Sequence, residues 1–257
     1  MMNLATEFPP ATRGTVVVWG LLAAYPFGGM TWQVLHHLAG LRALGFDVWY
    51  VEDSDRYVYD PETYCLTSDY VPNLKYLEDL MRRLQMEDRW VFRPTGSYEV
   101  CHGALDITGL EKLYREAEAV LNLSGAQELR DEHLESRCLV FIETDPVANQ
   151  VAVSQGDKRL ISELEKYDFL FTYGENLGAH DCRVPVERFK WYPTRPPVYT
   201  DWWAPPGPLP SGAAFTTISN WTHTGKDIAW DGESWAWRKD VEFKRFINVA
   251  AARGQPL

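Results

Sequence analysis

The chain has 257 residues, of which 46% are hydrophobic and 24% are charged, an ordinary composition for a folded globular protein. Its 25 Lys and Arg against 36 Asp and Glu give a net charge of −11. This charge argues against a nucleic-acid or anionic-membrane partner, because both need basic patches. The length allows one large domain or two small ones.

The first elements of the chain have the pattern of a βαβ unit. Residues 1–14 contain two prolines and no secretory signal, and we expect them to form a disordered tail. The Val-rich run over 15–23 predicts a strand that is buried on both faces. Residues 30–44 have the apolar spacing of a helix that ends at Gly45, and 46–51 predict a second, parallel strand.

The alternation of strands and helices continues to about residue 193. Further strands are predicted over 90–92, 119–123, 138–142, 169–172 and 189–192, and helices over 73–87, 110–117 and 158–165. We expect a polar loop over 54–71 and a helix or an excursion over 127–135. The pattern predicts one α/β domain over 15–193, with a Rossmann-like, doubly wound parallel sheet.

The composition changes after this domain. Prolines are frequent from Pro193 to Gly212, which predicts a linker over 194–212 rather than a sheet element. Beyond the linker we predict a strand at 215–218, a polar loop over 219–226 and a helix over 240–252. Residues 213–257 are therefore expected to begin a second domain.

The four cysteines are isolated in the sequence and form no CxxC pair, which favours buried thiols in a reducing compartment over a zinc site. The longest early apolar run, Val16–Tyr25, is far shorter than the ~20 residues of a membrane-spanning helix. We expect a cytoplasmic protein with no transmembrane segment and no nucleic-acid partner.

Ligands of parallel sheets bind beyond the carboxyl ends of the strands, so the residues after each predicted strand are the candidates. Gly28 and Gly29 open a helix whose first amides can receive an anionic or hydroxyl-bearing ligand, although a tight turn also needs small residues. The loop lacks the GxGxxG dinucleotide fingerprint, which disfavours NAD(P) binding.

Carboxylates follow several of the predicted strands. Glu143 and Asp145 come after a buried strand, and with Asp53 and Glu175 they are candidates for an acidic pocket. Asp145, Glu143 or Asp53 could act as the general base that deprotonates an alcohol, or could serve as a helix cap or an arginine partner. No GxSxG, HExxH or Walker pattern is present, which disfavours hydrolases, proteases and NTPases.

Several segments together resemble one family. Gly-Leu-Leu-Ala-Ala-Tyr-Pro-Phe-Gly-Gly-Met-Thr-Trp-Gln33, then Gly-Leu-Arg-Ala-Leu-Gly45 and Phe-Asp-Val-Trp-Tyr-Val-Glu-Asp53, resemble the first βαβ unit of GT-B fold glycosyltransferases of the family 1 and family 4 kind. Residues 139–146 and 167–175 resemble the last strands of that fold's N-terminal domain, and 191–197 its crossing into the second domain. The resemblance covers most of the chain, as a topology with loose motifs.

The resemblance implies a glycosyltransferase that moves a sugar from a nucleotide-sugar donor to an acceptor, between two Rossmann-like domains. The co-substrate would be a UDP-, GDP- or dTDP-sugar, the acceptor a small molecule, glycan or lipid, with no bound cofactor and no metal. The resemblance places acceptor binding at Gly28, Gly29, Thr31, Asn122, Ser124 and Glu175, and donor binding at Asn220, Trp221 and Lys226.

The chain also departs from that family. The family's usual His or Asp base after the first strand is missing from residues 24–31, so we expect the base elsewhere, or retention of configuration without one. Residues 213–257 are far fewer than the ~100 of a small domain, so we expect a truncated second domain, a fragment and an inactive chain.

Two other functions remain open. One is a non-catalytic Rossmann-like module that binds a nucleotide or a sugar, and the other is a sugar-nucleotide epimerase or related nucleotide enzyme on the same fold. The late tryptophans could stack on sugars, dock a partner or pack a domain core. They are Trp221, Trp230, Trp235 and Trp237.

Overall fold

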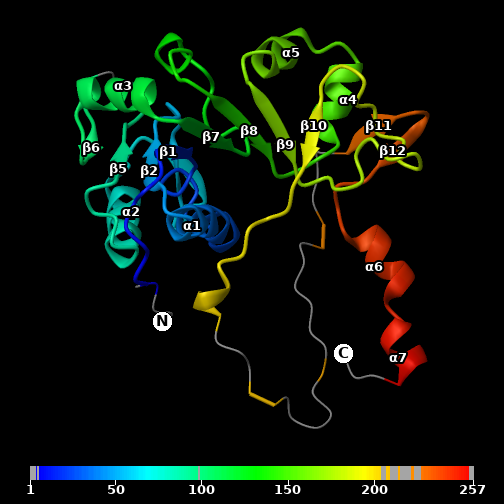
Figure 1. The fold of residues 1–257 in the computed structure, drawn as a ribbon. Coiled ribbons are helices and arrows are strands. Elements are labelled where there is room, and N and C mark those ends of the chain that lie inside the picture. The colour runs from blue at the N-terminus through cyan, green and yellow to red at the C-terminus, as the bar shows by residue number, and fades with distance from the viewer. Residues whose placement is uncertain are drawn as a thin grey trace. The chain divides into compact units, whose positions relative to one another are not determined.

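The computed structural model describes residues 4, 6–97, 99–203, 207–208, 214, 221–222 and 227–254. The chain divides into two compact units, Met1–Trp202 and Trp203–Leu257. The first unit carries an eight-stranded sheet with helices on both faces, whereas the second has a hairpin and two short helices (Figure 1). Within the described ranges, no helix has the length and apolar character needed to cross a membrane.

The sheet of the first unit is mostly parallel. Its parallel strands are β1 (Thr15–Trp19), β2 (Asp47–Glu52), β5 (Trp90–Phe92), β7 (Ala119–Leu123), β8 (Leu139–Glu143), β9 (Phe169–Thr172) and β10 (Trp191–Pro193). β6 (His102–Gly103) pairs antiparallel with β5 at one edge, and the order is β10-β9-β8-β7-β1-β2-β5-β6. This order confirms the predicted Rossmann-like fold, with the switch point between β1 and β7.

Helices cover both faces of this sheet (Figure 1). α1 (Gly28–Ala43) and α2 (Val71–Arg83) pack on one face, and α3 (Ile107–Glu116), α4 (Ala148–Ser154) and α5 (Lys158–Leu164) on the other. Val16 and Val18 of β1 are buried in the first layer, and Val17 and Trp19 in the second. Burial on both faces explains why the strands have nearly continuous apolar sequences.

The structure adds short elements to those predicted. A hairpin of β3 (Val58–Asp60) and β4 (Cys65–Thr67) lies inside the expected polar loop over 54–71, and β6 and α4 are also new. Residues 127–135 contain a single 3-10 turn, η1 (Asp131–His133), rather than a full helix. Elements of two to seven residues are too short for a hydrophobic period to identify them in the sequence.

The cysteines of this unit are all free. Cys101, Cys138 and Cys182 are partly buried, whereas Cys65 is exposed. The expectation of buried thiols is therefore wrong for Cys65, because it lies on the outer hairpin rather than on a strand of the central sheet.

Residues 6–14 differ from the disordered tail that the sequence predicts. The Thr12 backbone N–H donates to the Gly45 carbonyl at 3.0 Å, and Leu4 is buried in the main core. Phe8 also packs against the main core, so the described residues of this segment contact the large domain. This outcome depends on contacts that are distant in sequence and that local composition does not reveal.

The segment after β10 is also part of the first unit. Trp202 is buried and donates its Nε1–H to the Thr6 hydroxyl at 3.0 Å. The Tyr199 N–H donates to His36 Nδ1 at 3.0 Å, and burial lowers the pKa of His36, which keeps that nitrogen available as an acceptor. The linker predicted over 194–212 is thus held against the domain as far as Trp202.

The second unit contains a hairpin of β11 (Ile228–Trp230) and β12 (Glu233–Trp235). Its turn residues Asp231 and Gly232 have φ of +50° and +73°. Two successive left-handed residues are what a two-residue type I′ turn requires, and Asp-Gly is a preferred sequence for it. The Trp-rich stretch is thus partly a local β-hairpin.

The helical part of the second unit also departs from the prediction. The single helix expected over 240–252 is divided into α6 (Asp240–Phe246) and α7 (Val249–Arg253). The predicted strand at 215–218 and most of the predicted loop over 219–226 lie outside the described residues.

Candidate functional site

The loops that follow β1 and β7 meet at the switch point of the sheet. Leu21 and Ala24 from the first loop and Ala126 from the second form a small buried apolar cluster. Ser124 and Gly125 have φ of +57° and +64°, so the chain leaves β7 through two left-handed residues. Apolar side chains of the two loops therefore fill the space between them next to the sheet.

The amides of the loop after β1 are taken by the end of β2. Glu52 accepts hydrogen bonds from the Ala23 and Ala24 N–H groups at 2.8 and 2.6 Å and from the Tyr50 hydroxyl at 2.6 Å. The same hydroxyl accepts the Leu22 N–H at 2.9 Å. Burial raises the pKa of Glu52 to about 7, against the opposing effect of these donors. In dinucleotide-binding domains, amides in this position bind phosphate.

Asp53, the next residue, is surrounded by cations and is 2% exposed. Its carboxylate accepts from Arg93 Nε, from Arg130 Nη2 at 2.5 Å and from the Tyr114 hydroxyl at 3.2 Å. Both guanidiniums also pair with Glu132, at 2.6 Å for Arg130 and 3.6 Å for Arg93. Two carboxylates and two guanidiniums therefore balance their charges in one network.

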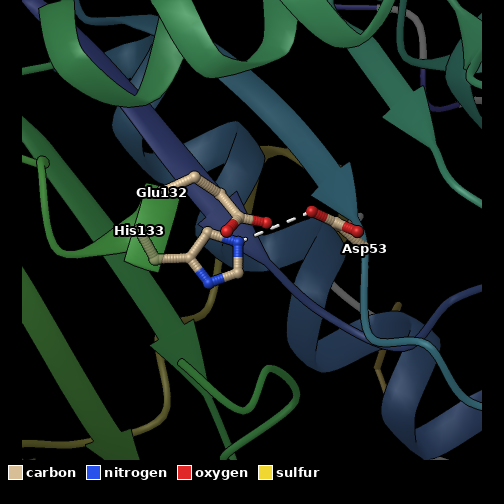
Figure 2. A group of neighbouring side chains, drawn as sticks. All are labelled: Asp53, Glu132 and His133. Atoms are coloured by element: carbon tan, nitrogen blue, oxygen red, sulfur yellow. Dashed lines mark ion pairs between the residues drawn. The ribbon is translucent and has the colours of Figure 1, made fainter. Parts of the chain in front are cut away.

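Asp53, Glu132 and His133 point toward one another (Figure 2). The atoms with which they could bind a metal ion lie within 4.8 Å of one another. The Arg130 amide donates to His133 Nδ1 at 3.0 Å, which assigns the proton to Nε2, 3.5 Å from Asp53. Burial is the main cause that lowers the pKa of His133 and keeps it neutral. A metal ion would have to displace guanidiniums from these carboxylates, so the group fits an ion-pair network better than a metal centre.

Glu143 ends β8 and is also 2% exposed, but its partners are uncharged. Its Oε2 accepts from the Thr172 hydroxyl at 2.6 Å and from Gln150 Nε2 at 2.7 Å. Its Oε1 has no partner in hydrogen-bond geometry among the described residues, and the nearby Asn149 side chain only partly offsets the effect of burial on the pKa of Glu143. Burial raises the pKa of Glu143. Gln150 in turn accepts the Val147 N–H at 2.7 Å, so Glu143 braces the loop that follows it.

The braced loop carries Asp145, which is exposed at the carboxyl edge of the sheet. The adjacent Thr144 hydroxyl lies 2.6 Å from the Ser124 hydroxyl, so the loops after β7 and β8 are in contact. Val147 has φ of +91°, a strained conformation for a β-branched residue. The loop after β8 therefore presents the Asp145 carboxylate and the Thr144 hydroxyl, and the loop after β7 adds the Ser124 hydroxyl beside them.

The four carboxylates proposed for an acidic pocket do not gather at one place. β7 and β1 lie between β8 and β2, so Glu143 and Asp53 are separated by three strand spacings, roughly 14 Å. Glu175 follows β9, the neighbour of β8, and pairs with Arg195 at 2.6 Å. The structure thus places Asp145, Glu143 and Glu175 on one side of the switch point and Asp53 on the other.

Two predicted acceptor residues use their polar atoms inside the domain. Asn122 donates to the Gln127 carbonyl and to the Tyr167 hydroxyl, both at 2.7 Å, and its Oδ1 accepts the Gln127 N–H at 3.1 Å. The Thr31 hydroxyl lies 2.7 Å from that of Tyr76, between α1 and α2. These bonds hold a loop and a helix pair in position.

Gly28 and Gly29 form the exposed first turn of α1, and a Cβ at either position would meet no atom within 4 Å. The residue before them, Phe27, offers no side-chain hydrogen bond to the helix. The amino end of α1 is therefore open at the same edge as Ser124.

In the second unit, Trp221 is 45% exposed and its ring centroid lies 5.9 Å from that of Phe243. Asn220 and Lys226, the other predicted donor residues, lie outside the described residues. Sequence reasoning missed Arg93 and Arg130. Arg93 directly follows β5, so the rule of examining strand ends would have found it, whereas Arg130 lies in an irregular segment without a recognisable signal.

A cavity of about 480 Å³ lies at the amino ends of the strands, where the N-terminal segment passes the start of β2. Phe8, Arg42 and Arg89 contribute to its lining. Ligands of doubly wound sheets bind at the carboxyl edge, so the loops described above are the stronger candidate. Comparisons of the chain with protein-family models, curated proteins and solved structures give no match.

Proposed function

We propose that this chain is the acceptor-binding part of a GT-B type glycosyltransferase, which moves a sugar from a nucleotide-sugar donor to an acceptor at the carboxyl edge of the sheet. One observation carries the proposal. The groups with which a Rossmann-like domain binds a nucleotide are occupied by the chain's own side chains, whereas the neighbouring loops after β7 and β8 present polar groups to solvent.

The occupied groups argue against a nucleotide site in this unit. A dinucleotide-binding domain offers the amides after its first strand to phosphate and an acidic residue near the second strand to a ribose hydroxyl. Here the Ala23 and Ala24 amides bind Glu52, and Asp53 binds Arg93 and Arg130. This arrangement disfavours the nucleotide-binding module and the epimerase, and it fits a domain that receives the acceptor.

Asp145 is the general base that we propose. A base must come within hydrogen-bond reach of the acceptor hydroxyl, and Asp145 is exposed whereas Asp53 and Glu143 are buried. The acceptor oxygen bonds to C1 of the donor sugar as the bond from C1 to the diphosphate oxygen breaks. The nucleoside diphosphate leaves with that electron pair, and Asp145 takes the hydroxyl proton.

The test is a transfer assay on the longest natural polypeptide that contains these residues. UDP-, GDP- and dTDP-sugars are combined with a panel of alcohol, glycan and lipid acceptors, and mass spectrometry detects the added glycosyl unit. Asp145→Asn should lower kcat by about 10²- to 10⁴-fold, the usual contribution of general base catalysis. Glu116→Gln, at an exposed residue near the end of α3, is the matched control.

Two results would contradict the proposal. Absence of transfer with every donor and acceptor would overturn the activity, and binding of glycosides without transfer would support the sugar-binding module instead. Unchanged kcat in Asp145→Asn, with transfer present, would reject this residue as the base while the activity stands.

A further inference from the structure

Three aromatic rings lie together beside the amino end of α1. Tyr25 and Phe27 stack with ring centroids 6.1 Å apart, and Tyr59 meets Phe27 edge-on at 4.9 Å. Phe27 is 41% exposed, and Tyr25 and Tyr59 are partly buried. We refer to these three rings as the aromatic platform. Phe27 is thus the ring of the platform most accessible to solvent, with Tyr25 and Tyr59 packed beside it.

The backbone beneath the platform is held rigidly. The Tyr59 N–H donates to the Ala24 carbonyl at 2.8 Å, which joins the β3–β4 hairpin to the loop after β1. The buried Asn73 side chain donates to the Ala23 and Tyr59 carbonyls at 2.7 and 3.0 Å. The rings are therefore positioned before any ligand arrives, and binding needs little further ordering.

Polar contacts connect the platform with the proposed catalytic edge. Arg56, which precedes the hairpin, is exposed and its Nη2 donates to the Gly125 carbonyl at 3.4 Å. Gly125 follows Ser124, whose hydroxyl meets that of Thr144, the residue before Asp145. An acceptor lying along this path would have an apolar contact at one end and hydroxyl, guanidinium and carboxylate groups at the other.

The hairpin segment that carries Tyr59 is acidic. The hairpin segment carries the acidic residues Asp55, Asp60 and Glu62 against the single cation Arg56. This excess of negative charge disfavours an anionic ligand, and a purely apolar ligand would gain nothing from the hydroxyl and guanidinium groups. A neutral sugar ring matches both requirements, because its C–H face packs on an aromatic face and its hydroxyl edge forms hydrogen bonds.

We infer that the aromatic platform of Tyr25, Phe27 and Tyr59 binds a neutral glycosyl ring of the acceptor. The acceptor is then a sugar-bearing molecule whose reacting hydroxyl lies toward Asp145. This inference rests on the proposed function and narrows its acceptor class from small molecule, glycan or lipid to a neutral glycoside.

The test uses saturation-transfer NMR and titration on the 257-residue chain. The probes are neutral methyl hexopyranosides, the corresponding methyl glucuronide, which adds a carboxylate, and cyclohexylmethanol, which lacks the hydroxyls. We expect saturation of the ring C–H protons of a neutral glycoside. Phe27→Ala and Tyr59→Ala should each raise its Kd about tenfold. Phe27→Leu should raise it similarly, because leucine keeps the apolar volume but has no ring face.

Tyr64→Asn is the matched control. Tyr64 lies on the same hairpin, is 78% exposed and has φ of +58°, a conformation that asparagine tolerates. The Kd of the neutral glycoside should be the same for Tyr64→Asn as for the wild type. Circular dichroism checks that every variant is folded. Tighter binding of the glucuronide, binding of cyclohexylmethanol alone, or an unchanged Kd in both Phe27→Ala and Tyr59→Ala would overturn the inference.

The inference and the proposed function fail in different ways. If transfer occurs but Phe27→Ala leaves the KM for the acceptor unchanged, the platform inference is overturned and the activity stands. If neutral glycosides bind and the platform variants weaken them, but no donor supports transfer, the platform stands and the transferase activity is rejected.

Discussion

Asp53 and Glu143 are two equally buried carboxylates at the carboxyl edge of one sheet, and their surroundings are opposite. Asp53 faces Arg93 and Arg130, whereas Glu143 has uncharged partners and one oxygen without a hydrogen bond. A buried carboxylate remains ionised when cations pair with it, whereas burial without a cation raises the pKa and favours the neutral acid, as at Glu143. Burial at a strand end therefore does not identify a functional carboxylate. The groups that pair with its charge must be examined as well.

Glu52 is intermediate between these two. Its carboxylate is buried and accepts from three donors, but these donors are two amides and a hydroxyl rather than cations. The negative charge is thus compensated to a decreasing extent in the three side chains. Asp53 pairs with guanidiniums, Glu52 accepts hydrogen bonds from uncharged donors, and Glu143 has an incomplete set of hydrogen bonds.

The largest effect is expected from Arg93→Met, which leaves Asp53 with an incomplete set of cationic partners. The variant should lower the free energy of unfolding by about 3–5 kcal/mol, the usual cost of breaking a buried ion pair from one side. Urea denaturation measures it. Arg115→Met is the control, because Arg115 pairs with Glu135 at the surface, where loss of a pair changes stability by about 0–1 kcal/mol. A loss below 1 kcal/mol in Arg93→Met would show that the network is not needed for stability.

The second effect is a pH dependence that originates at Glu52. Its folded pKa of about 7 lies above the ordinary value of 4.5, so the folded state holds the proton more tightly than the unfolded state. Stability from this group is present below about pH 4.5 and is lost as the pH rises to 7, by about 3 kcal/mol in total.

Glu52→Gln tests that pH dependence, since glutamine does not titrate. The unfolding free energy of the wild type minus that of Glu52→Gln should fall by about 3 kcal/mol from pH 4.5 to pH 7, because only the wild type loses stability as Glu52 ionises. Glu62→Gln, at an exposed position, is the control and should leave the slope unchanged. A difference that is constant with pH would mean that Glu52 titrates normally.

The smallest effect is expected from Glu143→Gln. Glutamine keeps an oxygen that can accept from Thr172 and removes a poorly compensated charge, so the free energy of unfolding should change by less than about 1 kcal/mol. Asp53→Asn, which removes a charge from a paired site, should destabilise the chain clearly more. Equal losses in the two variants would contradict the distinction between the two carboxylates.

Much of the fold could be predicted because the central strands are buried on both faces. β5, β7 and β9 lie where the apolar runs predict them, and α1 begins within two residues of the expected start. The β3–β4 hairpin and α4 are too short for a hydrophobic periodicity that would predict them from the sequence. The order of the segment at residues 6–14 depends on packing against distant residues.

The candidate site was accessible to sequence reasoning only in part. The rule of examining strand ends selects Asp53, Glu143 and Asp145, but it treats them alike. Their difference arises from Arg130 and Gln150, which lie in other segments and approach only after folding. The same is true of Tyr59, whose contact with Phe27 depends on how the hairpin folds back.

The sequence by itself determined the class of the fold, because two-sided burial of parallel strands imposes continuous apolar runs and alternating amphipathic helices. It also placed polar groups at the carboxyl ends of the strands. The tertiary structure decided which of those groups remain accessible. Partners from distant segments bind Glu52, Asp53 and Asn122, whereas Asp145 and Phe27 stay exposed. Such pairing depends on spatial neighbours rather than on local sequence.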